Sequence, residues 1–201
     1  MAKIKLTTGG EYKKRHEASD RIIDFTNVEK RNLLMRYDNV DSAKIEIPNK
    51  GATNFYVTTK ALSLINVLNW IEHKRGKAEI VYIYLYTLNE LMARYVVDLS
   101  KRTKLFLIVS DIMNSQREKE RLITRLLEQG DSEIVFCHNH AKIIAAKFRN
   151  DYITLTGSMN AGANARIETL EIFNCEKMYN FVAEQYEYLK QHFRIKPRYY
   201  D

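Results

Sequence analysis

The stretch EIVYIYLYTLNELMARYVVDLSKRTKLFLIV, residues 79–109, decides the fold class because it holds two apolar runs on either side of a helical pattern. Glu79–Tyr86 and Lys104–Val109 are rich in apolar, β-branched and aromatic residues, as is typical of strands buried on both faces. Between them, Thr87–Glu90 fits a helix-capping box. An apolar stripe at helical spacing accompanies the box: Leu88, Leu91, Met92, Tyr95 and Leu99. Strand, helix and strand in this order predict a parallel β-α-β unit.

The residues before this unit predict two further strands and a helix. Ala43–Pro48 alternates like a half-buried strand and stops at a proline, and Asn54–Thr59 is typical of a second strand. The helix that follows is expected to be capped by Thr58 or Thr59. It is expected to end at Gly76, behind a basic last turn.

The residues after the unit predict another helix and then a change of rhythm. Ser115–Glu118 fits a second capping box, and its helix is expected to end near Gly130. Arg149–Asp151 is a good hairpin turn. The remaining segments are expected to be four strands and a last helix: Ser132–Phe136, His138–Phe148, Tyr152–Thr156, Thr169–Phe173 and Glu176–Phe193.

Length and composition indicate one globular domain. The chain has 201 residues, of which 45% are hydrophobic and 28% charged, so it has enough apolar residues for a core. We expect the domain to cover residues 41–201, behind a basic N-terminal arm of uncertain structure at residues 1–40. Cys137 and Cys175 favour free thiols, with one disulfide between them as the alternative.

The charge balance favours an anionic partner. The net charge is +7 and the pI about 9.3, which fits nucleic acid, an acidic membrane face or a phosphorylated substrate, and also a solvated basic surface. The N-terminal residues lack the apolar core of a signal peptide. The longest apolar run, Ile80–Tyr86, is far short of the roughly 20 residues that cross a bilayer. We therefore expect a soluble, cytoplasmic protein without a membrane partner.

A second stretch, HNHAKIIAAKFRNDYITLTGSMN, carries the candidate chemistry in a His-x-His-x-Lys motif at its start. Because residues i and i+2 share a face of a strand, His138, His140 and Lys142 are expected to project to one side. Lys142 beside His140 would help to bind an anion. We interpret His138 as a surface or supporting residue.

The same stretch ends in Gly157-Ser158-x-Asn160, after the returning strand of the hairpin, so this end can lie beside the His-x-Lys pair. Glycine allows close approach of the backbone, and Ser158 and Asn160 are neutral hydrogen-bond donors. Together the two motifs predict a cup for a tetrahedral oxyanion, which a phosphate diester would fill.

His-x-Lys, a hairpin and Gly-Ser-x-Asn in this order resemble the phospholipase D superfamily, specifically its small single-motif nucleases and nuclease-like proteins. The resemblance implies an α/β fold with one domain per chain. That fold is a three-layer α-β-α sandwich on a mixed, mostly parallel sheet.

The resemblance also implies the site. His140, Lys142, Ser158 and Asn160 would surround the phosphate, and all but His140 would bind it. A downstream glutamate orients the histidine in that family, and Asn164–Glu168 resembles the Asn-x-Arg-x-Glu variant of that motif. Glu168 is therefore the predicted fifth catalytic residue.

Four further positions bear on this resemblance. Glu171 is the reserve for Glu168, and His138 is a reserve site residue. The family usually has Asp seven residues after the histidine, where this chain has Lys147. Asp151, at the turn, is a poor substitute by spacing.

A phosphodiester transfer of this type needs one histidine to attack phosphorus and another to protonate the leaving oxygen. No other histidine of the chain begins a second His-x-Lys, so one chain holds half a site. A two-fold homodimer would bring two copies together. The resulting hypothesis is a metal-independent and cofactor-free phosphodiesterase, preferentially a DNA rather than an RNA nuclease. It would act through a phosphohistidine on His140.

Four alternatives stay open. A nucleic-acid-binding protein that keeps the phosphate cup without turnover is favoured by Lys147, and a phospholipid-directed phosphodiesterase is weaker because no interfacial apolar helix stands out. Cys137, His138 and His140 are of the types that bind zinc, although Cys137 and His138 would face opposite sides of a strand. The alternating tyrosines at 82, 84 and 86 favour core and interface packing over stacking of bases.

Overall fold

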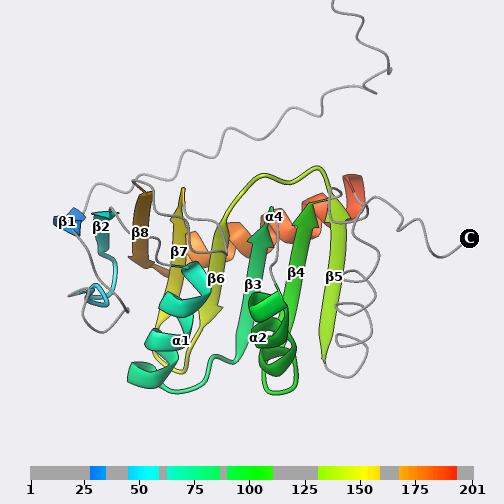
Figure 1. Cartoon of the computed structure of the whole chain (residues 1–201), viewed down its shortest axis with the longest axis horizontal. Helices are drawn as coiled ribbons and strands as arrows, with labels where there is room; N and C mark the ends of the chain where they lie inside the picture. The colour runs from blue at the N-terminus through cyan, green and yellow to red at the C-terminus, as the bar shows by residue number, and fades with distance from the viewer. Residues whose placement is uncertain are drawn as a thin grey trace, which may run out of the picture.

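A computed structural model describes residues 28–34, 45–58, 63–86, 90–110, 131–158 and 168–193. These residues form one eight-stranded sheet in the order β1-β2-β8-β7-β6-β3-β4-β5 (Figure 1). The strands are β1 Val28–Leu34, β2 Thr53–Thr58, β3 Ile80–Leu85, β4 Lys104–Ser110, β5 Ser132–Cys137, β6 Ile143–Lys147, β7 Tyr152–Gly157 and β8 Glu168–Asn174.

The sheet is mixed, as predicted, but it is not mostly parallel. Three strand pairs are parallel, β1–β2, β3–β4 and β4–β5, and four are antiparallel. The antiparallel excess arises because the β6–β7 hairpin and β8 lie between the two parallel groups. In Figure 1, β3, β4 and β5 therefore end at the upper edge of the sheet, where β6 and β8 begin.

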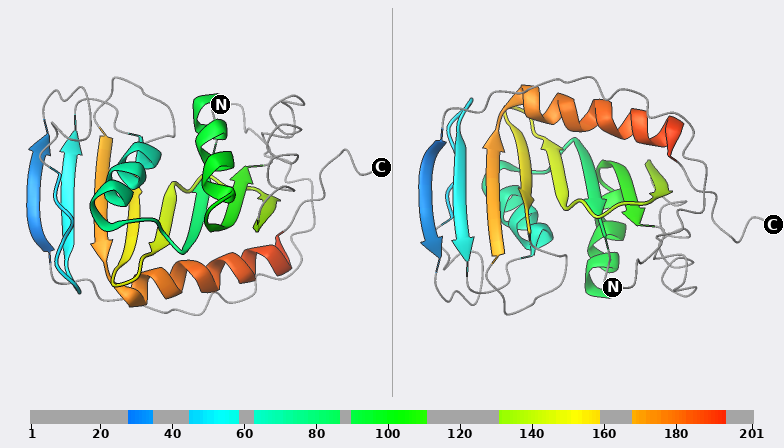
Figure 2. Two further views of the ribbon diagram at one scale, coloured as in Figure 1. Left: turned by 90° about the horizontal axis from the view of Figure 1, so that it is seen from below. Right: turned by 90° about the horizontal axis from the view of Figure 1, so that it is seen from above.

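Helices cover both faces of the sheet and give the predicted three layers. α1 Leu64–Arg75 and α2 Glu90–Ser100 lie on one face, and α4 Glu176–His192 crosses the other (Figure 2). Because side chains alternate along a strand, β3 supplies both cores. Val81 and Ile83 belong to the core under α1 and α2, whereas Tyr84 belongs to the core under α4.

Tyrosines fill the core under α4. The Tyr82 ring stacks on Phe106 with centroids 4.7 Å apart, and the Tyr84 hydroxyl donates to the Val182 carbonyl at 2.6 Å. Burial raises the pKa of Tyr84, with smaller contributions from Tyr82 and other acidic neighbours. The packing role predicted for the first two alternating tyrosines is therefore confirmed.

The ends of α1 show which local signals were informative. Gly76 ends the helix with φ 88°, a conformation that favours glycine, so the predicted stop is confirmed. The predicted caps were wrong, because β2 extends through Thr58 and Ser63 caps the helix instead. The Ser63 hydroxyl accepts from the Ile65 N–H at 3.2 Å.

The strand predicted at Ala43–Pro48 is also wrong for the residues that the structure describes, because residues 45–49 are in neither a strand nor a helix. Side chains of β2 occupy the backbone groups that a neighbouring strand would need. The Tyr56 hydroxyl accepts from the Glu46 N–H and donates to its carbonyl, and the Asn54 amide donates to the same carbonyl. The outer edge of β2 instead pairs with β1, which comes from within residues 1–40.

Some predictions lie wholly or partly outside the described residues: the helix from Ser115 to Gly130, Thr87–Asn89 of the first capping box, and Asn160. Cys137 and Cys175 are both free thiols. Within the described part of the chain, no helix is long and apolar enough to span a membrane.

Candidate active site

The segment from His138 to Lys142 is not part of a strand, contrary to the prediction. β5 lies at one end of the sheet and β6 lies beyond β4 and β3, so the chain has to cross their carboxyl ends between the two strands (Figure 1). A segment that runs across neighbouring strands cannot pair with them, and β6 starts only at Ile143. The crossing places His140 and Lys142 at the edge where ligands of α/β sheets bind.

Asn139 fixes this crossing segment to the sheet. Its side-chain amide donates to the Leu85 carbonyl, at the end of β3, at 3.1 Å. Its side-chain oxygen accepts from the Ala141 N–H at 2.9 Å. These two bonds turn Asn139 inward and hold the exposed His140 between two anchored residues.

His140, Lys142 and Tyr86 form a contact group on this segment. The Lys142 Nζ lies 3.5 Å from the His140 Nδ1 and donates to the His140 carbonyl at 3.2 Å. The rings of Tyr86 and His140 have centroids 4.4 Å apart, and the Lys142 ammonium lies 5.9 Å from the centre of the Tyr86 ring. A cation, an imidazole and an aromatic ring thus meet at one exposed point.

Tyr86 is the residue of this group that the sequence interpretation missed, because it was grouped with the packing tyrosines. It differs from them in position, since β3 ends at Leu85 and Tyr86 is only partly buried. The signal was available: Tyr86 is the last residue of a strand expected to be parallel, and residues at the carboxyl ends of such strands commonly line binding sites.

Ser158 and Glu168 form a second group, at the adjoining ends of β7 and β8. The Ser158 hydroxyl donates to a carboxylate oxygen of Glu168 and accepts from the Thr169 N–H at 2.9 Å. The Ser158 N–H donates in turn to the Thr169 hydroxyl at 3.2 Å. Glu168 is 8% exposed, so a serine with all these contacts holds a buried carboxylate in place.

Gly157 allows β7 and β8 to approach closely at this point. A Cβ atom at this position would lie 2.0 Å from the Thr169 carbonyl oxygen, which belongs to the neighbouring backbone. No side chain can be placed there without moving a strand. The predicted role of this glycine, close approach of the backbone, matches this geometry.

Strand register brings the two groups to one edge. Ile143, which follows Lys142, pairs with Thr156, and Gly157, which precedes Ser158, pairs with Leu170. Lys142 comes directly before β6 and Ser158 directly after β7, so both lie at the same edge of the sheet. Glu168, the first residue of β8, lies at that edge too. At the usual strand spacing of about 4.8 Å, the backbones of β6 and β8 are about 10 Å apart there.

Glu171, Lys147 at the family's aspartate position, and Asp151 belong to neither of these two groups. Glu171 is an odd number of residues from Glu168, so it lies on the opposite face of β8, and burial raises its pKa. Lys147 is at the far end of β6, with its Nζ 3.2 Å from a Glu79 carboxylate. Asp151 is buried and accepts from the Asn174 amide at 2.9 Å.

The side chains considered for a zinc site do not form a ligand cluster in the described part of the chain. Cys137 is buried in the core under α4, while His138 and His140 are exposed. Within the described residues, no group of three or more His, Cys, Asp or Glu side chains could hold a metal ion.

Comparison with solved structures identifies the fold. The chain is similar to Nuc, a phospholipase D family member from Salmonella typhimurium, with a TM-score of 0.53 and 17% identity, covering 71% of this chain and 97% of Nuc. It is also similar to polyphosphate kinase from Porphyromonas gingivalis, with a TM-score of 0.51 and 14% identity, and spans 24% of that chain and 67% of its own length. No family profile and no curated protein sequence matches it. The fold predicted from the motifs, that of the phospholipase D superfamily, is therefore confirmed.

Proposed function

We propose that this chain, which has the phospholipase D fold, is a metal-independent phosphodiesterase that cleaves DNA as a homodimer. One observation carries the proposal: the imidazole of His140 and the ammonium of Lys142 are in contact at the edge where Ser158 and Glu168 also lie. A nucleophile and a positively charged side chain at one exposed point suit attack on a phosphate diester.

In the proposed first step, the unprotonated Nε2 of His140 attacks phosphorus with its lone pair, and the bond from phosphorus to the leaving oxygen breaks. The protonated His140 of a second copy gives that oxygen its proton. In the second step, this now neutral imidazole takes a proton from water, and the resulting hydroxide displaces the first histidine from phosphorus. The products are an alcohol and a phosphate monoester, and both imidazoles return to their starting states.

The contact of Lys142 with Nδ1 of His140 belongs to the resting site. For Nε2 to attack, the imidazole proton must reside on Nδ1, which a neighbouring ammonium group disfavours. We propose that Lys142 moves from the imidazole to a phosphate oxygen when the substrate binds. The Lys142 side chain is then a charge that neutralises the developing negative charge on phosphorus.

Ser158, Asn160 and Glu168 complete the proposed site. Because the Ser158 hydroxyl donates a hydrogen bond to Glu168, we assign Ser158 mainly to holding that carboxylate in place. Glu168 is the carboxylate that would accept a hydrogen bond from the Nδ1–H of His140 during attack, with the proton staying on Nδ1. Asn160, a phosphate-binding residue by resemblance, lies outside the described residues.

The requirement for two histidines supports a dimer. Of the other histidines in the described part of the chain, His73 is at the carboxyl end of α1, at the opposite edge of the sheet, and His192 is in the last turn of α4 beside Tyr188. His138 precedes the anchored Asn139 and is exposed. A second copy of the same surface is therefore the proposed source of the general acid.

DNA is the proposed substrate because the chain carries a net charge of +7 and the site is at an exposed edge. The fold alone does not choose the reaction, since the solved structures that share it include a polyphosphate kinase. The second candidate is a DNA-binding protein that keeps the cup without turnover. The specific observation in its favour is Lys147, which stands where the family usually has aspartate.

The deciding experiment is a cleavage assay on plasmid and single-stranded DNA in EDTA, with His140→Ala as the control. Cleavage by the wild type and none by the variant is the expected result. Cleavage that EDTA abolishes and a divalent ion restores would overturn the phosphohistidine mechanism. Binding without cleavage of any diester would leave the second candidate.

A further inference from the structure

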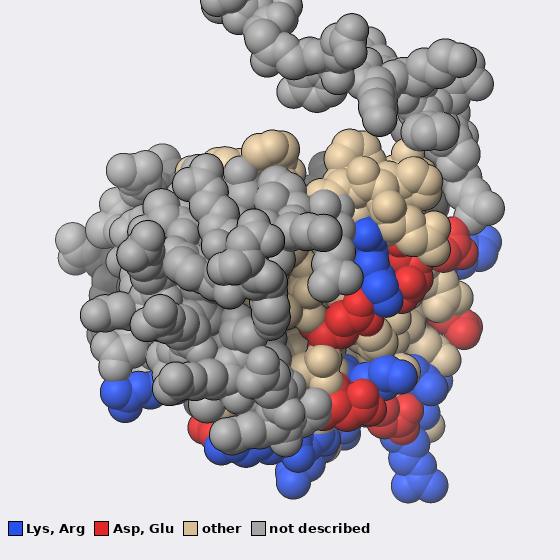
Figure 3. Space-filling model, turned by 90° about the vertical axis from the view of Figure 1, so that its right-hand side faces the viewer, with Lys and Arg blue, Asp and Glu red and all other residues tan. Residues whose placement is uncertain are grey.

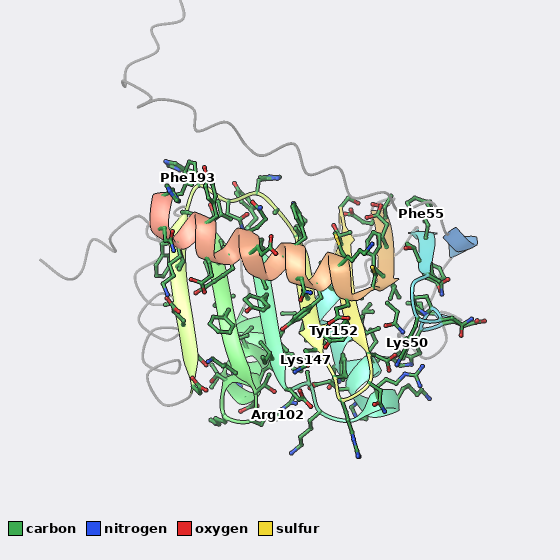
Figure 4. The ribbon with its side chains drawn as sticks, turned by 180° about the vertical axis from the view of Figure 1, so that it is seen from behind. Lys50, Phe55, Arg102, Lys147, Tyr152 and Phe193 are labelled. Atoms are coloured by element: carbon green, nitrogen blue, oxygen red, sulfur yellow. The ribbon has the colours of Figure 1, made fainter. Side chains whose placement is uncertain are left out.

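We infer that the lower edge of the sheet, opposite the candidate active site, binds the phosphate backbone of double-stranded nucleic acid. The residues that form this basic edge are Lys50, Lys74, Lys77, Lys104 and Arg149. All five are exposed. Figure 3 shows Lys and Arg gathered along the bottom of the molecule, and Figure 4 labels Lys50, below Phe55 of β2.

The basic edge is assembled from segments far apart in the sequence. Lys50 precedes β2, Lys77 lies between α1 and β3, and Lys104 is the first residue of β4. Arg149 is in the turn between β6 and β7. The strand directions bring all of these segments to the lower edge, so the gathering of charge is a product of the fold and not of one basic run.

The acidic residues near this edge are largely neutralised by other cations. Arg75 pairs with Asp151, Lys101 with Asp98, Arg102 with Glu72 and Lys147 with Glu79. Of the described acids at this edge, Asp131, which precedes β5, and Glu176, the first residue of α4, are exposed and belong to none of these pairs. The five cations of the basic edge form no ion pair with any described residue, so their charge is available to an anionic partner.

The span of the basic edge suits a duplex. From β2, beside Lys50, to β4, which begins at Lys104, there are five strand spacings, or about 24 Å. At about 3.4 Å per base pair, that length covers roughly seven base pairs. Several phosphates of a stiff double helix can therefore contact the edge together.

A membrane surface fits this edge less well. Peripheral membrane attachment combines basic residues with apolar side chains that enter the bilayer. Of the described residues, the large hydrophobic side chain that is well exposed is Phe193, and it lies toward the opposite, upper edge (Figure 4). Charge without adjoining apolar side chains is typical of a surface that contacts nucleic-acid phosphates.

This inference is independent of the proposed cleavage, because the basic edge and His140 are at opposite ends of the strands. One cation needs a separate explanation: Lys74 is in the last turn of α1, where a positive charge also stabilises the helix dipole. It is therefore left unchanged in the test.

The experiment compares two variants with the same change in net charge. The edge variant replaces four cations with glutamine: Lys50→Gln, Lys77→Gln, Lys104→Gln and Arg149→Gln. The control variant adds four acids at exposed or half-exposed helix positions: Asn66→Asp, Asn180→Asp, Gln185→Glu and Gln191→Glu. Both are made in the full chain with His140→Ala, so that no DNA is consumed, and their affinity for a short DNA duplex is measured by fluorescence anisotropy over a salt series.

We expect the edge variant to bind the duplex at least tenfold more weakly than the control. The slope of log affinity against log salt concentration should also be less steep in the edge variant than in the control by about 3–4, because each phosphate contact contributes about 0.9 to that slope. Equal affinities of the two variants would overturn the inference, since binding would then follow net charge alone. Binding of the parent chain to phosphatidylglycerol vesicles through these residues, with no binding to the duplex, would also overturn it. Failure of cleavage in the wild type would leave this result untouched.

Discussion

The Ser158 hydroxyl donates a hydrogen bond to the Glu168 carboxylate, which is buried at the first residue of β8. The same hydroxyl accepts from the Thr169 N–H, so one small side chain joins the ends of two strands. Burying a carboxylate is costly unless it is hydrogen-bonded, so Ser158 contributes to stability as well as to the proposed chemistry.

Ser158→Ala should destabilise the fold by about 1–3 kcal/mol, because it leaves a buried carboxylate and a backbone N–H without this partner. The loss is measured as a shift in the urea midpoint at unchanged slope. Ser158→Thr keeps the hydroxyl and should lose less. Loss of cleavage at full stability would show instead that Ser158 contacts the substrate directly.

Gly157→Ala should be more damaging than its size suggests. The added methyl group would lie 2.0 Å from the Thr169 carbonyl oxygen, so β7 and β8 would have to separate where Ser158 and Glu168 meet. We expect a loss of more than about 2 kcal/mol in the free energy of unfolding. Gly76→Ala is the comparison, because its Cβ meets open space and its cost comes from the positive φ. Equal losses in the two variants would contradict the contact with Thr169.

The sequence predicted the strands of the sheet well where burial leaves a strong pattern. The residues of β3 and β4 are apolar on both faces because helices cover both sides, and that pattern does not depend on distant contacts. The false strand at residues 43–48 shows the limit. Its alternation fits an extended chain, but the Tyr56 hydroxyl and the Asn54 amide occupy the backbone groups of Glu46.

The site was predictable as a set of residues but not as an arrangement. The motif names His140 and Lys142, yet their conformation follows from the strand order, which forces the chain to cross β4 and β3. No local sequence pattern specifies the order of the strands in the sheet. Tyr86 and Asn139 were missed for the same reason, because their contacts are with segments that only the folded sheet brings near.

A buried ion pair away from the site gives a prediction about pH. Burial raises the pKa of Glu72, but two bonds from Arg102, at 2.6 Å each, and smaller contributions from the Ala78 N–H and Tyr95 outweigh it, so the pKa is below the ordinary 4.5. Because folding lowers the pKa of Glu72, the pair stabilises the fold at pH values above the pKa of the unfolded chain. This contribution is lost as pH falls through the pKa of the folded chain.

Arg102→Ala should therefore destabilise the fold by about 2–3 kcal/mol at neutral pH, because it leaves a buried carboxylate without its cation. The difference from the wild type should shrink as pH falls through the range in which the Glu72 carboxyl group is protonated in the variant but still ionised in the wild type, and it should level off below the lowered pKa of the wild type. Urea unfolding at a series of pH values measures it. A difference independent of pH would show that Arg102 acts through packing and not through its charge.

Lys147→Asp, which restores the residue usual in the family, should not increase cleavage. Lys147 is at the opposite end of β6 from Lys142, beside Glu79, so a carboxylate there would lose an exposed ion pair and gain a like-charged neighbour. The expected cost is below about 1 kcal/mol. An increase in turnover, measured on plasmid DNA, would mean that position 147 supports the site through the strand and that Lys147 restrains the wild type.

The roles proposed for His140 and Lys142 are separable by mutation. His140→Ala removes the atom that forms the bond to phosphorus and keeps the ammonium, so cleavage should be abolished while affinity for a short diester changes little. Lys142→Ala removes a charge that contacts the phosphate before and during reaction, so affinity should fall as well. One lost charge-assisted hydrogen bond is worth about 1.5–3 kcal/mol, or roughly one to two powers of ten in affinity. Equal effects of the two variants on binding would contradict this division.

The shared site gives the strongest test, because it predicts the behaviour of mixed dimers. Light scattering should first show a dimer of the 23.7 kDa chain at micromolar concentration, and a monomer throughout would remove the shared site. A heterodimer of wild type and His140→Ala, purified through two different tags, has one histidine where attack and protonation need two. It should therefore be as inactive as the His140→Ala homodimer, whereas a heterodimer of wild type and Lys147→Asp, which keeps both histidines, should remain active. Half activity in the His140 heterodimer would mean that each chain works alone, and the general acid would then have to come from within one chain, with His138 the first residue to test.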